Sequence, residues 1–189
     1  MYKLWQKKLI SKYPESVIDI VQFGSSVLAE TEPNDIDIAI IFQNIPVREQ
    51  LLISQNIKEQ IERKTALQIH IKPYDLYSLL DAGNFARQGI MYYGISLLSK
   101  TYFSKRFGLR PAGYIYYSLK NKQKKDKIQI NYLLSGKKGK YGLLRAYGGR
   151  LLKPGLITIN PEHEKIFVKA MEDSKVDYFL ERTFIMDNE

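Results

Sequence analysis

The stretch 21-VQFGSSVLAETEPNDIDIAIIF-42 joins two apolar segments and carries the most informative polar residues of the chain. Both segments are rich in β-branched residues, which predicts strands over 17–23 and 35–42. The second strand opens with Asp35 and Asp37, and because side chains alternate along a strand, both carboxylates project from one face. Two negative charges so close together repel each other, so a partner that offsets them is expected.

A divalent cation and a phosphate group would suit the polar residues of this stretch. Two carboxylates on one face fit Mg²⁺ or Mn²⁺, which take their other ligands from water and substrate phosphates. Gly24 and Ser25 follow the first strand, where free backbone N–H groups and one or two helical turns are expected. We therefore take Gly24, Ser25 and Ser26 as candidate phosphate ligands, and Asp35 and Asp37 as candidate metal ligands and catalytic residues.

The run "GSSVLAETEPNDIDIAI" resembles the GS…DxD signature of the DNA polymerase β-like nucleotidyltransferases, especially their minimal members from archaea and bacteria. The likeness extends over roughly residues 15–100 and includes "RQGIMYYGISLL", which is similar to a closing helix of many members. The resemblance implies that the glycine and serine contact nucleotide phosphates and that both aspartates bind metal. It also implies transfer of a nucleoside monophosphate from a nucleoside triphosphate to an acceptor hydroxyl.

One position departs from this family pattern. Many members carry a third carboxylate on a later strand, and the matching segment here, "LQIHI", offers His70 instead. A neutral imidazole can accept a proton or bind a metal, so His70 is a candidate catalytic residue. Asp75, in the following loop, is an alternative source of the missing carboxylate.

The remaining pattern predicts an α+β protein with one domain over 1–99 and a small basic α+β domain over 100–189. The resemblance implies that the first of them is a nucleotidyltransferase domain. The first domain is expected to have a mixed sheet flanked by helices. Its further predicted elements are helices over 2–12, 47–65, 74–83 and 85–100, and a strand over 66–71. In the second domain we expect a strand over 156–159, a helix with Asn160 as its N-cap, and a final strand over 176–185.

The positive charge is concentrated in one segment. Residues 100–153 contain 15 Lys and Arg against one acidic residue, whereas residues 1–99 have a net charge of −1. Tyrosines are interleaved with these cations, and the combination suits RNA or DNA. The candidate nucleic-acid-binding residues are Lys122, Lys124, Lys125, Lys137, Lys138, Lys140, Arg145 and Arg150.

Three features that the sequence lacks bear on the cellular location of the protein and on membrane partners. There is no cysteine, no recognisable signal peptide, and the longest charge-free run, 88–99, is too short to span a bilayer, so we expect a cytoplasmic protein. Two alternatives stay open beside a nucleotidyltransferase acting on RNA. One is a non-catalytic nucleic-acid-binding protein with a degenerate site. The other is an antitoxin-type enzyme that modifies a small helical partner protein.

Overall fold

The computed structural model describes residue 4 and residues 9–137 and 140–186, and the chain divides into two compact units between Leu109 and Arg110. Both units combine helices and strands, as the predicted α+β class requires. The division lies ten residues beyond the expected boundary at 99/100. The reason is that Phe103 is buried in a core of the first unit, so the segment after residue 99 packs with that unit. The predicted helix over 2–12 falls mostly outside the described residues, and its described end, residues 9–12, is not helical.

Strands and helical segments alternate along most of the first unit. In chain order they are β1 (Val17–Phe23), the 3-10 turn η2 (Gly24–Val27), β2 (Asp35–Phe42), α1 (Val47–Glu62), β3 (Gln68–Asp75), α2 (Leu76–Leu80), the π-helical turn η3 (Gly89–Tyr93), β4 (Ile95–Ser96) and the 3-10 helix η4 (Phe103–Phe107).

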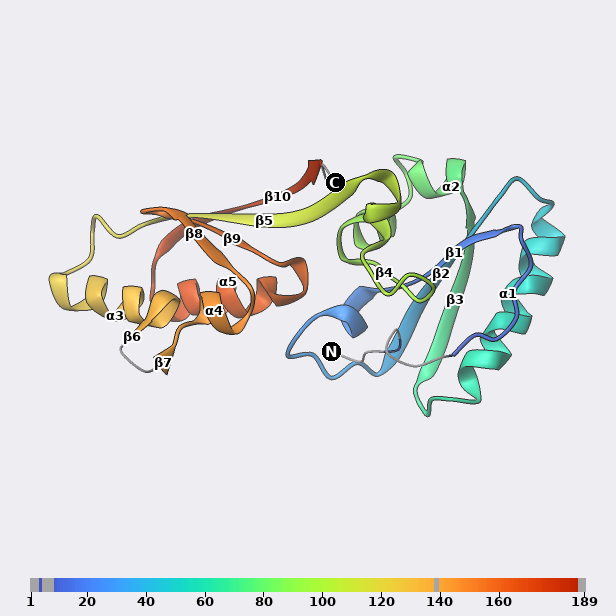
Figure 1. The fold of residues 1–189 in the computed structure, drawn as a ribbon, viewed down its shortest axis with the longest axis horizontal. Coiled ribbons are helices and arrows are strands. Elements are labelled where there is room, and N and C mark those ends of the chain that lie inside the picture. Colours follow the sequence, from blue (N-terminus) through green and yellow to red (C-terminus); the bar gives the residue numbers. More distant parts are fainter. Residues whose placement is uncertain (1–3, 5–8, 138–139, 187–189) are drawn as a thin grey trace. The chain divides into compact units, whose positions relative to one another are not determined.

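The four strands of this unit form one mixed sheet in the order β3-β2-β1-β4. Strand β1 runs antiparallel to both β2 and β4, whereas β2 and β3 are parallel. A parallel pair needs a crossover connection, and α1 provides it (Figure 1). The mixed sheet flanked by helices is therefore present as predicted.

Each face of the sheet is covered by its own apolar cluster. Ile36, Ile38 and Ile40 of β2 pack with Ile57 and Ile61 of α1 on one face. On the other face, residues of β1, β2 and β3 pack with the segment after β3; they include Val21, Ala39, Tyr74, Leu79, Ile90 and Phe103. Asp35 and Asp37 belong by alternation to this second face, at the end of β2 where the apolar side chains have not yet begun.

Four predicted elements of the first unit differ in extent, among them the helix over 74–83, which is limited to α2 (Leu76–Leu80). Helix α1 begins as predicted but ends at Glu62, and β3 covers 68–75 rather than 66–71. The predicted helix over 85–100 is wrong beyond residue 93, because the chain there becomes β4 and pairs with β1. Gly94 allows this close approach, since a Cβ at that position would lie 2.6 Å from Cγ1 of Val21.

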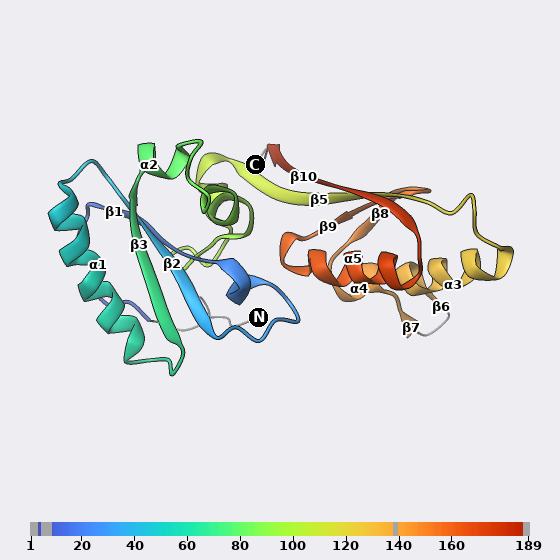
Figure 2. The same cartoon turned by 180° about the vertical axis from the view of Figure 1, so that it is seen from behind.

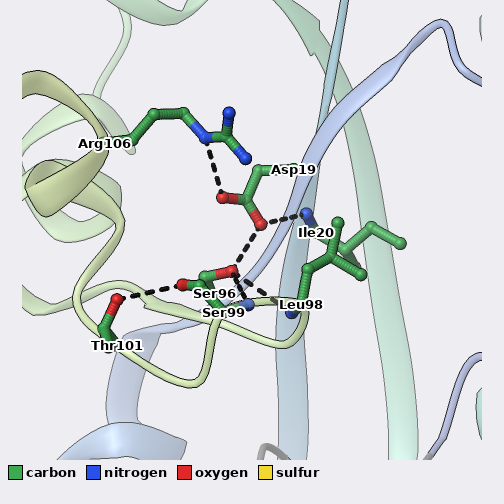
Figure 3. A network of polar contacts seen from close by, with 7 residues as sticks. All are labelled: Asp19, Ile20, Ser96, Leu98, Ser99, Thr101 and Arg106. Atoms are coloured by element: carbon green, nitrogen blue, oxygen red, sulfur yellow. Dashed lines mark hydrogen bonds and ion pairs between the residues drawn. The ribbon is translucent and has the colours of Figure 1, made fainter.

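A buried carboxylate fastens the end of the first unit to β1 (Figure 3). Asp19 is 1% exposed, and its Oδ1 accepts hydrogen bonds from Ser96 Oγ at 2.6 Å and from Ile20 N at 2.8 Å. Nε of Arg106 lies 3.2 Å from the other carboxylate oxygen. A buried charge is stable only with such partners, so residues 96–106 are held against β1.

The second unit also combines strands and helices. Its elements are β5 (Leu109–Ser118), α3 (Lys124–Ser135), the hairpin strands β6 (Gly136–Lys137) and β7 (Lys140–Tyr141), α4 (Leu143–Ala146), β8 (Arg150–Lys153), β9 (Leu156–Ile159), the 3-10 turn η5 (Pro161–His163), α5 (Glu164–Asp173) and β10 (Asp177–Met186).

The sheet of this unit has the strand order β10-β5-β9-β8, and β9 is antiparallel to both β5 and β8. Helices α3, α4 and α5 lie on one side of it (Figure 2). Ile115, Ile157 and Ile159 of the sheet pack there against helix residues such as Leu134 and Phe167. The opposite side of the sheet is described below.

The predicted strand over 156–159 is confirmed, and the final strand lies within one residue of its predicted position. The helix predicted from Asn160 begins instead with a 3-10 turn, and the Asn160 side chain makes no capping hydrogen bond. No helix in the described part of the chain is both long and apolar enough to cross a membrane.

Candidate active site at the start of strand β2

The register of three strands gathers the predicted site residues. Asp37 of β2 lies opposite Phe23 at the end of β1, and opposite His70 of β3 on its other side. Gly24 comes directly after Phe23, so the chain turns beside the Asp37 carboxylate. Residues separated by 46 positions in the sequence, Gly24 and His70, are thereby brought to the same aspartate.

Gly24 has a backbone conformation and a position that favour glycine. Its φ of +74° lies in the left-handed region, where a Cβ is sterically costly. A Cβ at this position would also overlap Oδ2 of Asp37. The Gly24 backbone therefore lies directly against the Asp37 carboxylate. A phosphate bound by the Gly24 turn would consequently lie close to a cation bound by Asp37.

The two serines after Gly24 have different surroundings. Ser25 is exposed. The Ser26 hydroxyl is buried, donates to Phe23 O at 3.0 Å and accepts from Gln22 Nε2 at 3.0 Å. The Ser26 side chain is thus engaged within the turn, and only its backbone N–H remains as a possible phosphate ligand.

His70 lies between the two carboxylates. Its Nδ1 is 3.3 Å from Oδ2 of Asp35 and 3.8 Å from Oδ1 of Asp37, and its side chain is 51% exposed. Burial and the neighbouring charge of Asp35 raise the pKa of Asp37, while His70 lowers it. The ionised form of Asp37 is therefore disfavoured, as the crowding of like charges predicts.

The carboxylates of Asp35 and Asp37 are chemically suited to bind a hard divalent cation. Both offer oxygen ligands from one face, and an added positive charge would relieve the repulsion that raises the pKa of Asp37. Within the described residues, no group of three or more His, Cys, Asp and Glu is arranged to hold a metal. The fit therefore rests on Asp35 and Asp37, with substrate and water as the other ligands.

A pocket of about 420 Å³ adjoins Asp37 and His70. Lys72 and Tyr74 of β3 line it on the same face as His70, because they follow that residue at intervals of two. Phe85, from the loop after α2, also lines it, and its side chain is fully exposed. The pocket combines a cation with an open aromatic ring, which suits a phosphorylated compound with a planar group.

Asp75 does not supply the missing third carboxylate. It lies opposite Phe42, at the other end of the β2–β3 pair from Asp35. Five residues of strand separate it from His70, which corresponds to roughly 16 Å. Its carboxylate instead accepts a hydrogen bond from Ser78 N at 2.7 Å and caps α2, and this bond lowers the pKa of Asp75.

The predicted nucleic-acid-binding residues lie on several elements of the second unit. Lys122, Lys124 and Lys125 precede or begin α3; Lys137 and Lys140 lie on the β6–β7 hairpin; Arg145 lies on α4 and Arg150 on β8. Two contact aromatic rings: Arg145 is 4.1 Å from the Tyr141 ring centroid and Lys137 is 5.4 Å from that of Tyr132. Lys138 lies outside the described residues.

Sequence reasoning missed Lys72 and Phe85. Alternation from His70 would have placed Lys72 on the same face, whereas no local pattern marks the Phe85 loop. No protein-family model matches the chain, and a search of curated proteins likewise finds no match.

Proposed function

We propose that the protein is a Mg²⁺-dependent nucleotidyltransferase that transfers a nucleoside monophosphate from a nucleoside triphosphate to an acceptor hydroxyl. The observation that carries this proposal is the contact of Gly24 with Asp37, beside Asp35 and His70. A backbone turn without a side chain and two crowded carboxylates together suit a triphosphate and its cation. The resemblance of the GS…DxD stretch to nucleotidyltransferases supports the same function.

The backbone N–H groups of Gly24 and Ser25, with the exposed Ser25 hydroxyl, would orient the triphosphate. Asp35 and Asp37 would hold Mg²⁺, which neutralises the charge on the phosphate oxygens when it is bound. In the reaction, the acceptor oxygen forms a bond to the α-phosphorus while the bond to the bridging oxygen of the β-phosphate breaks. Pyrophosphate leaves with that electron pair.

His70 would receive the proton of the acceptor hydroxyl. Its Nδ1 faces the carboxylates, which favours the tautomer that carries the proton on Nδ1. The lone pair of Nε2 is then available to a hydroxyl group. This arrangement replaces the third carboxylate of the family pattern by a neutral base that is oriented by Asp35.

RNA is the acceptor class that we favour. Residues 110–186 contain 16 Lys and Arg against seven Asp and Glu, a net charge of +9, which suits a polyanion. The pocket lined by Lys72 and Phe85 supplies room for a planar group beside His70. A small helical partner protein is the second acceptor class, and it enters the experiment below as an outcome.

A transfer assay tests the proposal. The full chain is incubated with each labelled nucleoside triphosphate, Mg²⁺ and an RNA pool, and separately with the proteins of a cell extract. We expect a labelled acceptor with at least one triphosphate, and at least a thousand-fold slower labelling with Asp35→Asn/Asp37→Asn. Asp126→Asn, which removes a charge from the first turn of α3, is the matched control and should label normally.

Two results would contradict the proposal. One is the absence of labelled product with every triphosphate and acceptor. The other is labelling that survives the double substitution. If the chain binds RNA equally well with and without the two aspartates but labels nothing, it is a nucleic-acid-binding protein with a degenerate site. The absence of a third carboxylate beside Asp35 and Asp37, among the residues that the structure describes, favours this second function.

A further inference from the structure

The sheet of the second unit has one face without a helical cover. Ile115 and Ile157 point toward α3, α4 and α5, so their neighbours along the strands point the other way. We call this side the open face; its residues are Tyr114 and Tyr116 of β5, Leu156 and Thr158 of β9, Arg150 and Lys153 of β8, and Phe179 and Glu181 of β10. None of the described helices of this unit covers it (Figures 1 and 2).

Two aromatic rings stand next to each other on the open face. Tyr116 and Phe179 come from neighbouring strands, with ring centroids 6.2 Å apart and planes inclined by 39°. Phe179 is 64% exposed and Tyr116 is 40% exposed. Aromatic side chains contribute most to stability when they are buried, so an exposed aromatic pair on a sheet indicates a candidate binding surface.

The Tyr116 ring is held in place by a hydrogen bond. Its hydroxyl donates to Oε2 of Glu181 at 3.0 Å, and Glu181 lies two residues beyond Phe179 on the same strand. This bond raises the pKa of Tyr116, so the hydroxyl stays protonated. A ring fixed in this way loses little conformational entropy when a planar group stacks on it.

Two tyrosines of β5, Tyr114 and Tyr116, each begin a row of paired residues that crosses β9 and ends at a cation on β8. Tyr114 is opposite Thr158, which is opposite Arg150; Tyr116 is opposite Leu156, which is opposite Lys153. Each row thus runs across three strands, from an aromatic residue to a cation roughly 10 Å away. Both cations are exposed. Planar groups can stack at one end while negative charges are neutralised at the other.

We propose that the open face binds single-stranded nucleic acid, with bases stacked on Tyr116 and Phe179 and phosphates near Arg150 and Lys153. The exposed cations Arg150 and Lys153 of this face are complementary to a phosphate backbone. A duplex keeps its bases stacked inside, so a flat aromatic surface selects a single strand. Because this site belongs to the second unit alone, the proposal does not depend on nucleotidyl transfer.

Fluorescence anisotropy with the full chain tests the site. The probe is a labelled 12-nucleotide single-stranded RNA, measured in EDTA without triphosphate, so that failure of the catalytic proposal leaves the result unchanged. Phe179→Ala should weaken binding by roughly ten-fold or more, and Phe179→Tyr should restore most of it, because stacking needs only a ring. Tyr77→Ala is the control; it removes a ring that is 87% exposed on α2 of the first unit and should bind like wild type.

Charge substitutions separate stacking from electrostatic attraction. Arg150→Gln/Lys153→Gln should lower the slope of log Kd against log salt by about 1.4, which corresponds to two phosphates of a single strand. Glu181→Gln should leave Tyr116 with an acceptor and bind a few-fold more tightly. Single-stranded DNA of the same sequence, used in parallel, shows whether the face also requires the 2′-hydroxyl.

Three outcomes would overturn the proposal. The first is binding of RNA by Phe179→Ala as tight as that of wild type, with unchanged circular dichroism. The second is duplex RNA that binds as tightly as the single strand. The third is a full chain that binds no single strand at low salt, in which case the exposed rings serve a protein partner instead.

Discussion

The two units of the chain arrange their polar residues in opposite ways. In the first unit, strand register brings Gly24, Asp37 and His70 to one point. In the second unit, the cations are spread over α3, a hairpin, α4 and β8. A site of the first kind depends on each residue and on its neighbours. A surface of the second kind tolerates the loss of any one residue, and this contrast can be tested.

Among single substitutions, the largest effect is expected at His70. His70→Gln removes the proton acceptor but retains a polar side chain, so kcat for nucleotidyl transfer should fall by about 100-fold or more. The Kd for triphosphate should change little, since Asp35, Asp37 and the Gly24 turn remain. Steady-state kinetics combined with equilibrium binding separates the two quantities. An unchanged kcat would show that His70 has no part in the chemistry.

Gly24→Ala should destabilise the first unit by about 1–2 kcal/mol, because the residue has a φ of +74° and its Cβ overlaps the Asp37 carboxylate. Native-state hydrogen exchange of the β1 and β2 amides measures this locally. In the double variant Gly24→Ala/Asp37→Ala the overlap is gone and only the backbone cost remains. The two effects should therefore be non-additive; additive costs would mean that the contact is unimportant.

The scattered cations of the second unit should behave differently. Lys137→Gln, Lys140→Gln and Arg145→Gln should each weaken RNA binding only about two-fold at physiological salt, and their effects should add. Anisotropy titrations of the single, double and triple variants measure this. If one substitution abolished binding, the hairpin and α4 would form a focused site like that of the first unit.

The smallest effect is expected for Asp37→Asn on thermal stability in the absence of metal. Burial and Asp35 raise the pKa of Asp37, so the folded state holds a proton more tightly than the unfolded chain. Stability is then lost as the pH rises from the ordinary carboxyl pKa through the raised value. At neutral pH in EDTA, Asp37→Asn should consequently raise the thermal midpoint by at most a few degrees.

Magnesium ions provide the control for this last substitution. They should stabilise wild type and not Asp37→Asn, so that the difference between the two proteins shrinks or reverses. A lower midpoint for Asp37→Asn in EDTA would contradict the electrostatic account of the site.

Alternation of side chains made the first unit largely predictable. Strands 17–23 and 35–42 agree with the prediction to the residue. His70 entered the candidate site through the resemblance of "LQIHI" to a family strand, and only the structure shows that it lies opposite Asp37. The helix over 85–100 was mistaken because its apolar spacing does not reveal that Gly94 packs against β1. Likewise, Ser26 shares its residue type with Ser25, and only the fold shows that its hydroxyl is buried.

Local sequence patterns could not predict the open face of the second unit. Phe179 lies outside the cationic segment 100–153, and it contacts Tyr116 only because β10 is the neighbour of β5 in the sheet. That pairing joins residues 63 positions apart, which no periodicity encodes. Strand order, a property of the whole unit, therefore decides which aromatic residues share a surface.

The most direct test of the central claim is isothermal titration of the full chain with nucleoside triphosphates in the presence of Mg²⁺ and, in parallel, of EDTA. This measurement needs no knowledge of the acceptor. We predict binding of at least one triphosphate that requires Mg²⁺ and is lost in Asp35→Asn/Asp37→Asn but kept in Asp126→Asn. Binding that is indifferent to Mg²⁺ and to both aspartates, or no binding of any triphosphate, would contradict the account.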